Sequence, residues 1–527
     1  MNISLTLKQA PGIPLFIGIM SALAMDAISS SSLTVIRLDL SGDLHLTTDD
    51  FSSLETCYMA AKISGWLLAA SISRCSGIRG LFIAAIGVYI CSSLLIPLSP
   101  TAGVFSLRVV AGFAAGIILT LGQAIIWMVY PRPHQPMLQM VYAIFAVVTS
   151  VNLTPAVQAW FVDNASWRYL FLIPIILGLL SLFCLPVSLL DDRKVVSFRR
   201  YAGSLLPRWI ILITAISSLT YILQQGERWD WLNAPGIRGA AIVALLSTGL
   251  FCLMEKCHSS KIFDLSVFHN ANFSFGVAVS FVAGFALFGS AYLIPAYALS
   301  IAGMTATESG LLILTGSISF SISLFIVAFL VQFRKVKALF AIPLGIILLI
   351  CAMFLFAGSN TESGLPDLIP PVAIRGLGIG LLLMALTLIT FMGLNNHLMA
   401  DAVGIFSACR QLGGLIGIAV LETIINDINA ISKTVLSSYL ASGNANYLDE
   451  LMKIKNKLLD NGYIATLADN KANNLIQETL SAQSVAIAYN NAFIVIVWMF
   501  TVAIPIVISF RLYLLWREKI KMNAKTQ

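Results

Sequence analysis

Three charged side chains lie inside apolar stretches of the sequence, where a charge needs either a partner or a function. Asp26 lies within SALAMDAISSSSL, Lys62 within YMAAKISGW, and Arg108 near the start of SLRVVAGFAAGIILTLGQAIIW. At the helical rise per residue, they lie roughly 15, 12 and 10 Å from the outer ends of their predicted helices. These depths overlap, so one carboxylate and two cations are able to meet inside a membrane.

This set of side chains is suited to proton coupling. Loss of water favours the neutral form of a buried carboxylate, whereas a nearby cation favours its charged form. The carboxylate can therefore bind or release a proton when its surroundings change. We therefore predict that Asp26 carries a proton, with Arg108 as its specific partner and Lys62 as a second cation. In the alternative interpretation, Asp26 is a static counter-ion and the two cations extend toward the lipid headgroups.

The second half of the chain has deep cations without a carboxylate at the same depth. Arg375 and Arg410 lie inside later apolar runs, and the polar residues Asn152 and Gln158 lie in an earlier one. We predict that these four side chains line a substrate cavity, although Asn152 and Gln158 could instead bond between helices. The polar segment between about 426 and 489 contains no Ser/His/Asp or Cys/His set, and the apolar runs contain no second catalytic carboxylate, histidine or metal set. No CxxC motif occurs, so we predict neither catalytic residues nor a metal site.

The composition places these residues in a membrane protein. Of 527 residues, 58% are hydrophobic and 11% are charged, whereas ordinary soluble domains have about 25% charged residues. Apolar runs of about 20 residues, the length of a transmembrane helix, occur about 14 times. They lie at about 13–36, 53–72, 80–98, 104–130, 137–161, 168–190, 208–225, 237–255, 272–296, 308–331, 337–357, 370–394, 402–426 and 489–513.

The charges outside these runs predict the topology. Lys and Arg gather in alternate loops and in the carboxyl-terminal tail. The first loop predicted on the opposite side of the membrane, 38–50, is acidic. Because cytoplasmic loops carry the excess of Lys and Arg, we predict that both termini lie in the cytoplasm. The formal charge of +7 therefore reflects topology, and we expect the lipid bilayer, not nucleic acid, as a partner.

The predicted spans are grouped as six, two and six. We predict an all-α polytopic membrane protein with a six-helix bundle at 1–190 and a basic cytoplasmic linker at 191–206. Two inserted transmembrane helices follow at 207–268, and a second six-helix bundle occupies 269–527. Within it, the polar segment 427–488 has apolar positions three and four residues apart, which predicts a periplasmic helical loop.

The fourth spans of the two sets of six share a pattern. Arg108 precedes Gly112 and Gly116, as Arg375 precedes Gly376 and Gly380. Glycines four residues apart lie on one helix face and allow another helix to approach closely. This recurrence is expected of a secondary transporter built from two related halves.

Several blocks of the sequence carry a family resemblance. The clearest is RGLGIGLLLMALTLITF and the RQLGGLIG that follows it, which contains Gly413 and Gly417; others are SWRYLFLIPIILG and GERWDW. In this order, the blocks resemble the fourteen-span drug:proton antiporters of the EmrB/QacA type in the major facilitator superfamily. The resemblance implies the major facilitator fold, with an acidic residue and an arginine that match Asp26 and Arg108.

Two motifs depart from the family pattern. The loop after the second span has Arg74 where the family usually has aspartate. The antiporter motif of span five is present only as TPAVQA, which keeps Pro155 but replaces the family's glycines. Larger side chains at that position would change how the helices of the two halves pack.

The resemblance also implies a function. It predicts export of amphiphilic small molecules across the bacterial inner membrane by alternating access, with the proton gradient as energy source and no other cofactor. Some relatives use a periplasmic adaptor and an outer-membrane channel, which are therefore candidate partners. The alternatives are a dedicated metabolite or siderophore carrier working in either direction, a non-transporting membrane enzyme, and a receptor or scaffold.

Overall fold

The part of the chain that the structure describes is folded into helices. The computed structural model describes residues 12–35, 42, 45–146, 167–185, 198–258, 261–440 and 445–526. Within these ranges there is no strand, and 11 helices are long and apolar enough to cross a membrane. The prediction of an all-α polytopic membrane protein is therefore confirmed.

Along the chain, the described helices fall in the first predicted bundle, the insert and the second predicted bundle, with one additional helix in the polar segment. The first bundle contains α1 (Ile13–Val35), α3 (Thr48–Ser76), α4 (Ile78–Leu95), α5 (Thr101–Val129), α6 (Gln135–Ala143) and α8 (Leu172–Cys184). The insert consists of α9 (Phe198–Gln225) and α10 (Pro235–Cys257). The second bundle contains α11 (Ala271–Ser300), α12 (Ala306–Phe333), α13 (Ala341–Ala357), α14 (Leu365–Phe391), α15 (Met399–Ser438), α16 (Ala445–Asp460) and α17 (Ala465–Thr526).

The two bundles repeat the same packing. In the first, α5 packs against α1, α3 and α4, and α8 packs against α1 and α4. In the second, α14 packs against α11, α12 and α13, and α17 packs against α11 and α13. The second helix of each bundle also begins with a capping box, Thr47 with Asp50 and Thr305 with Glu308. The repeat therefore extends from helix packing to local hydrogen bonds.

The paired glycines lie where the helices of each bundle approach most closely. A β-carbon at Gly112 would lie 2.5 Å from the Tyr58 carbonyl oxygen, and one at Gly116 would overlap the Lys62 carbonyl oxygen. In the second bundle, Gly376 and Gly380 of α14 face the backbone of α12 in the same way. The fourth helix of each bundle thus rests directly on the backbone of the second.

A substitution at this seam is expected to destabilise the protein. Gly116→Ala places a methyl group against backbone atoms that cannot rotate away, and overpacking of this kind costs about 1–3 kcal/mol. Gly87→Ala in α4 is the matched control, because a β-carbon there meets no atom within 4 Å. Thermal unfolding in detergent should show a lower midpoint for Gly116→Ala only. Equal midpoints for the two variants would contradict the close packing of α3 and α5.

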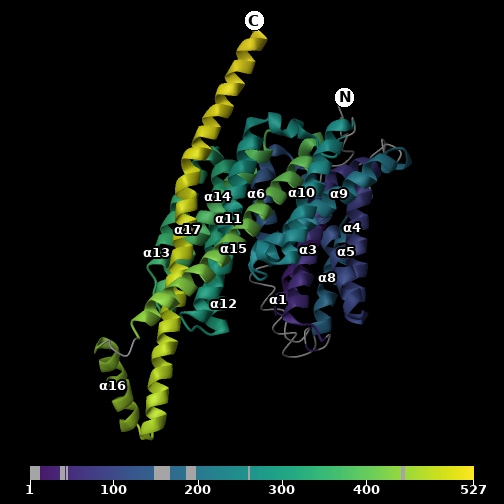
Figure 1. The fold of residues 1–527 in the computed structure, drawn as a ribbon. Coiled ribbons are helices and arrows are strands. Elements are labelled where there is room, and N and C mark those ends of the chain that lie inside the picture. Colours follow the sequence, from purple (N-terminus) through teal and green to yellow (C-terminus); the bar gives the residue numbers. More distant parts are fainter. Residues whose placement is uncertain are drawn as a thin grey trace.

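The polar segment 427–488 is largely a continuation of two membrane helices. α15 runs 40 residues to Ser438, and α17 begins at Ala465 and has 62 residues. Between them, Leu458 of α16 packs against Ala468 and Ala472 of α17. Figure 1 shows that α16 and the adjoining ends of α15 and α17 project well beyond both bundles. Hydropathy predicted breaks near 426 and 489 because apolar composition stops at the membrane boundary, whereas helical geometry continues.

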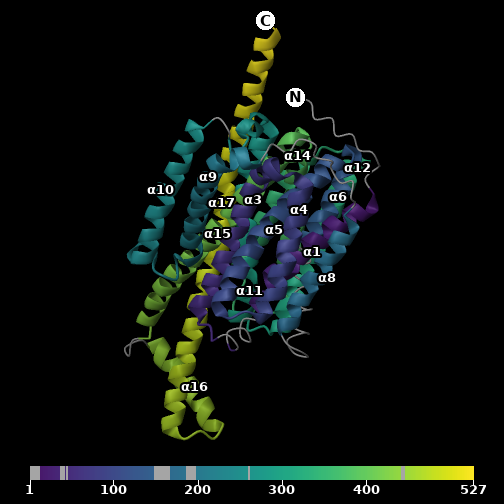
Figure 2. The same cartoon turned by 90° about the vertical axis from the view of Figure 1, so that its right-hand side faces the viewer.

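The insert packs against both bundles along one side of the molecule. α9 contacts α3 and α15, and α10 packs against α9, on the flank seen in Figure 2. Trp209 of α9 donates a hydrogen bond to the Ser71 hydroxyl, 3.1 Å away. Near the other end of α9, the Gln225 amide donates to Ser52 and Thr56 of α3 at 2.7 and 3.0 Å. The insert is therefore attached along the whole length of α3.

Candidate functional site

Asp26 lies in a buried cluster with two side chains of α3. Its carboxylate accepts a hydrogen bond from the Lys62 ammonium and another from the Tyr58 hydroxyl, each 2.7 Å long. The exposed fractions of Asp26 and Lys62 are only 3% and 8%. The two donors therefore satisfy both oxygens of a carboxylate that has almost no contact with solvent.

Arg108 joins this cluster through Tyr58. Its guanidinium lies 4.1 Å from the centre of the Tyr58 ring and donates to the Ser29 carbonyl at 3.3 Å. In this conformation Lys62 makes the ion pair with Asp26, and the predicted pairing of Asp26 with Arg108 stays a prediction. Arg108 has turned onto the aromatic face, where a planar cation is stabilised by the ring electrons.

The close packing of α3 and α5 explains why these residues meet. Tyr58 and Lys62 are four residues apart, so both point from one face of α3. Their own carbonyls are the atoms that Gly112 and Gly116 approach. That approach carries Arg108, one turn before Gly112, onto the Tyr58 ring. Sequence reasoning missed Tyr58, although its spacing from Lys62 was a usable signal.

The second bundle repeats the arginine but not the acid. Arg375 of α14 donates from Nε to the Ser290 hydroxyl at 2.7 Å and from Nη2 to the Leu287 carbonyl at 3.2 Å. This contact with α11 matches the contact of Arg108 with α1. Within the part of the chain that the structure describes, Arg375 forms no ion pair. A buried cluster that contains a carboxylate, such as the one around Asp26, is therefore a feature of the first bundle.

Arg410 lies on α15 where the two bundles face each other. Its guanidinium is 5.4 Å from the centre of the Phe406 ring, and Tyr142 of α6 is its electrostatic neighbour across the interface. Farther along α15, Gly413 and Gly417 pack against backbone atoms of α11. Arg375 and Arg410 therefore have different contact partners and do not contact each other in the structure.

Three predicted residues lie outside the described ranges. Asn152 and Gln158, predicted for the substrate cavity, and Pro155 of the span-five motif all fall between residues 147 and 166. Their roles therefore stay predictions.

The bundles contact each other at the end where we predict the cytoplasm. Trp127 at the end of α5 packs against Phe391 at the end of α14, with ring centres 5.7 Å apart. The Met137 amide of α6 donates to the Gln332 side chain of α12 at 3.2 Å. Both contacts join the first bundle to the second, so this end of the interface is closed.

Arg74 forms an ion pair across the same interface. Its guanidinium donates to Asp401 at the start of α15 over 2.6 Å and also to the Ile262 carbonyl in the segment after the insert. The Asp401 side chain is 2% exposed, whereas that of Arg74 is 42% exposed. The arginine that departs from the family pattern is therefore paired with a carboxylate of the other bundle.

At the opposite end, Glu227 attaches the insert to α15. Its carboxylate accepts hydrogen bonds from Trp231 at 2.9 Å, from Asn426 at 3.0 Å and from Thr423. Burial raises the pKa of Glu227, but these three donors outweigh it and leave the pKa below its usual value of 4.5. The donors hold the charged form, so the attachment depends on ionisation.

This attachment is expected to weaken in acid. Because the folded pKa of Glu227 is depressed, its stabilisation is complete above pH 4.5 and is lost as the pH falls through the folded pKa. Hydrogen–deuterium exchange of residues 226–234, corrected for the intrinsic rate, should accelerate below that pH in the wild type. Glu227→Gln should remove this acceleration of exchange in acid, whereas Asp230→Asn should keep it. An unchanged acceleration in Glu227→Gln would rule out Glu227 as its source.

These features together define a class of protein. Two related helical bundles, joined at one end and enclosing charged residues at membrane depth, form a secondary transporter, not an enzyme. A model of the Major Facilitator Superfamily matches residues 15–418, which is more than half of the chain. The chain belongs to this superfamily.

Known relatives agree with this membership. The chain is 24% identical to the colistin resistance protein EmrB of Acinetobacter baumannii, over 88% of each chain. It is 25% identical to the multidrug export protein EmrB of Haemophilus influenzae, over 79% of this chain and 81% of that protein. A crystal structure of the human organic anion transporter MFSD10 matches with a TM-score of 0.54 and 12% identity, covering 93% of this chain and 100% of that one. The structural match supports the major facilitator fold.

Proposed function

We propose that the protein exports amphiphilic small molecules by alternating access, driven by proton entry. The observation that carries this proposal is the buried ion pair of Asp26 and Lys62 inside the first bundle. The relatives named for multidrug export and colistin resistance support the outward direction and the substrate class. The proton gradient is then the energy source, and no cofactor is required.

The cluster can couple proton binding to a change of contacts. A proton that binds Asp26 removes the charge that holds Lys62, so the proton and the ammonium compete for one carboxylate. Lys62 has a flexible stem and can turn away, while Arg108 stays on the Tyr58 ring. One charge that crosses 100 mV releases about 2.3 kcal/mol, which can concentrate a substrate severalfold.

The charges near the interface suggest the kind of substrate. Within the described residues, neither Arg375 nor Arg410 makes an ion pair, and both are only partly exposed. A dedicated carrier of dications would need buried acids in their place. We therefore propose neutral, zwitterionic or anionic amphiphiles as substrates.

Orientation and further partners belong to the same proposal. With the basic loops inside, both termini lie in the cytoplasm and the projecting helices around α16 lie in the periplasm. This projecting part has exposed apolar side chains, among them Tyr439 and Met452. It is therefore where we would place a periplasmic adaptor that leads to an outer-membrane channel.

The decisive experiment uses purified protein in proteoliposomes with an imposed pH gradient. A panel of neutral, zwitterionic, anionic and dicationic amphiphiles is added, and both solute flux and proton flux are recorded. We expect flux of the first three classes that stops when an ionophore collapses the gradient. Solute flux that is independent of the gradient would contradict proton coupling, and absence of flux for every class would contradict transport of amphiphiles.

A further inference from the structure

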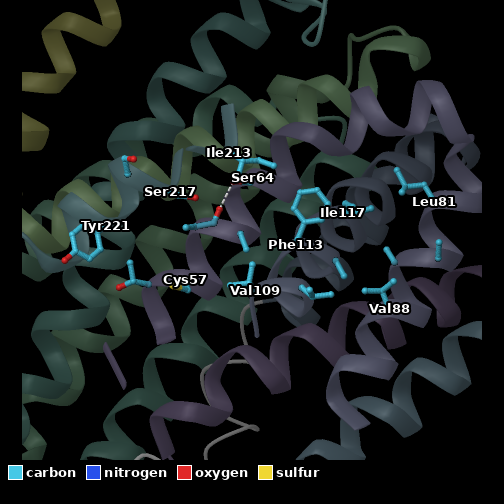
Figure 3. Close-up of a pocket in the computed structure, with 18 of the residues that line it drawn as sticks. Cys57, Ser64, Leu81, Val88, Val109, Phe113, Ile117, Ile213, Ser217 and Tyr221 are labelled. Carbon is cyan, nitrogen blue, oxygen red and sulfur yellow. Dashed lines mark hydrogen bonds between the residues drawn. The ribbon is translucent and has the colours of Figure 1, made fainter. Parts of the chain in front are cut away.

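A cavity of about 780 Å³ lies between the first bundle and the insert. This volume is within the range of roughly 300–1,000 Å³ that is typical of small-molecule sites. Its lining residues come from α3, α4, α5, α9 and α10, and none of them is charged. Figure 3 shows Tyr221 and Cys57 at one end of the cavity and Leu81 and Val88 at the other.

The walls of this cavity suit an apolar ligand. Small side chains leave the space open, namely Ala60, Ala61, Ala84, Ala85 and Ala114. The hydroxyls of Ser64 and Ser218 donate to carbonyls of their own helices, at 2.8 and 2.9 Å. These two hydroxyl donors are thus already used, and apart from the hydroxyls of Ser217 and Tyr221 the apolar wall offers little to replace the hydrogen bonds that a polar ligand loses to water on entry.

The cavity opens toward the lipid. Val88 of α4 and Val109 and Val110 of α5 line it, and they are 43%, 40% and 44% exposed. Both helices are long and apolar enough to cross the membrane, so an exposed apolar face within these spans contacts hydrocarbon. A ligand can therefore enter sideways from the bilayer.

The cavity is separated from the proton-coupling cluster. Cys57, Ala60 and Ser64 face it from α3, whereas Tyr58 and Lys62 point toward Asp26. Between the two sites, the Gly112 and Gly116 contacts leave no room between α3 and α5. A molecule in this cavity is consequently outside the route between the two bundles, which argues against a transported substrate as its occupant.

We propose that this cavity binds an acyl chain of a membrane phospholipid. The chain would fill a space that close-packed protein does not leave empty. It would lie between α4 and α5 of the first bundle and α9 and α10 of the insert. Tyr221, at the outer part of the cavity, provides a polar group toward the lipid's ester region. This site is independent of proton coupling and of the direction of transport.

Photo-crosslinking tests this proposal on the full chain in vesicles. The probe is phosphatidylethanolamine with a diazirine midway along one acyl chain, and adducts are mapped by mass spectrometry. We expect adducts on residues 81–88 and 109–117. Ala84→Phe combined with Ala240→Phe fills the cavity from two walls, and should lower these adducts at least fivefold. Labelling of the lipid-facing Phe325 and Phe329 serves as the internal reference.

A matched control and a second probe complete the test. Ala102→Phe with Thr248→Phe adds the same side chains at exposed positions outside the cavity, and should leave the adducts unchanged. Equal labelling of the wild type and the filled variant would overturn the proposal. So would labelling of the cavity by a photoreactive single-chain fatty acid but not by the phospholipid. A filled variant that loses substrate export but keeps lipid adducts would assign the cavity to the substrate instead.

Discussion

Asp26→Asn is expected to abolish proton-driven transport while the helices remain folded. Asparagine keeps the shape of the side chain, and its single carbonyl oxygen can still accept from Lys62 while its NH2 group donates to the Tyr58 hydroxyl oxygen, but it cannot carry a proton at neutral pH. Substrate flux in proteoliposomes should lose its response to an imposed pH gradient. Asp449→Asn on the exposed surface of α16 is the matched control and should leave the flux within about twofold of the wild type.

Stability must be separated from coupling in this experiment. Removing one partner of a buried ion pair costs about 3–5 kcal/mol, because the other charge stays buried. Adding Lys62→Met to Asp26→Asn removes that unpaired charge and should restore the thermal midpoint without restoring the response to pH. Recovery of proton-driven flux in the double variant would show that Asp26 is a static counter-ion.

Breaking the Arg74–Asp401 pair is expected to open the closed end of the interface. A hydrogen bond to a charged group contributes about 1.5–3 kcal/mol, which changes an equilibrium roughly 10- to 100-fold. Asp401→Asn should therefore shift the population toward longer distances between spin labels at residues 134 and 335. These two positions are exposed and lie next to the Met137–Gln332 contact. The distances are measured by electron paramagnetic resonance after replacement of the eight cysteines.

A charge exchange tests whether the pair itself is responsible. Arg74→Asp combined with Asp401→Arg should recover a larger fraction of the short distance than either single change. Loss of the Ile262 contact, which also depends on Arg74, keeps this recovery incomplete. If the double variant shows no larger fraction of the short distance than the single variant with the smaller fraction, the pair does not hold the interface.

Much of the fold follows from hydropathy. The predicted spans at 80–98, 237–255 and 337–357 agree closely with α4, α10 and α13, because each is a continuous apolar run between polar turns. The boundaries of α15 and α17 were missed, since helices that leave the membrane keep their geometry while their composition changes. Which helices pack together was accessible only through the repeated glycines.

The site was predicted in part. Depth along a helix placed Asp26, Lys62 and Arg108 at a common level, and the structure does bring them into one cluster. Depth does not define the direction in which a side chain points, so the choice between Lys62 and Arg108 as direct partner could not be made. The pairing of Arg74 with Asp401 depends on contacts between bundles more than 300 residues apart in sequence, which a single sequence does not reveal.

The continuity of α17 has a mechanical consequence. Residues 465–488 of this 62-residue helix extend about 36 Å before the predicted span begins. Because no loop interrupts the helix there, the extension acts as a lever on the second bundle. A rotation of that bundle by about 15° would move the lever's tip by about 9 Å, so small motions in the membrane become large displacements outside it. A fluorescent label on α16 should therefore report each transport cycle from outside the bilayer.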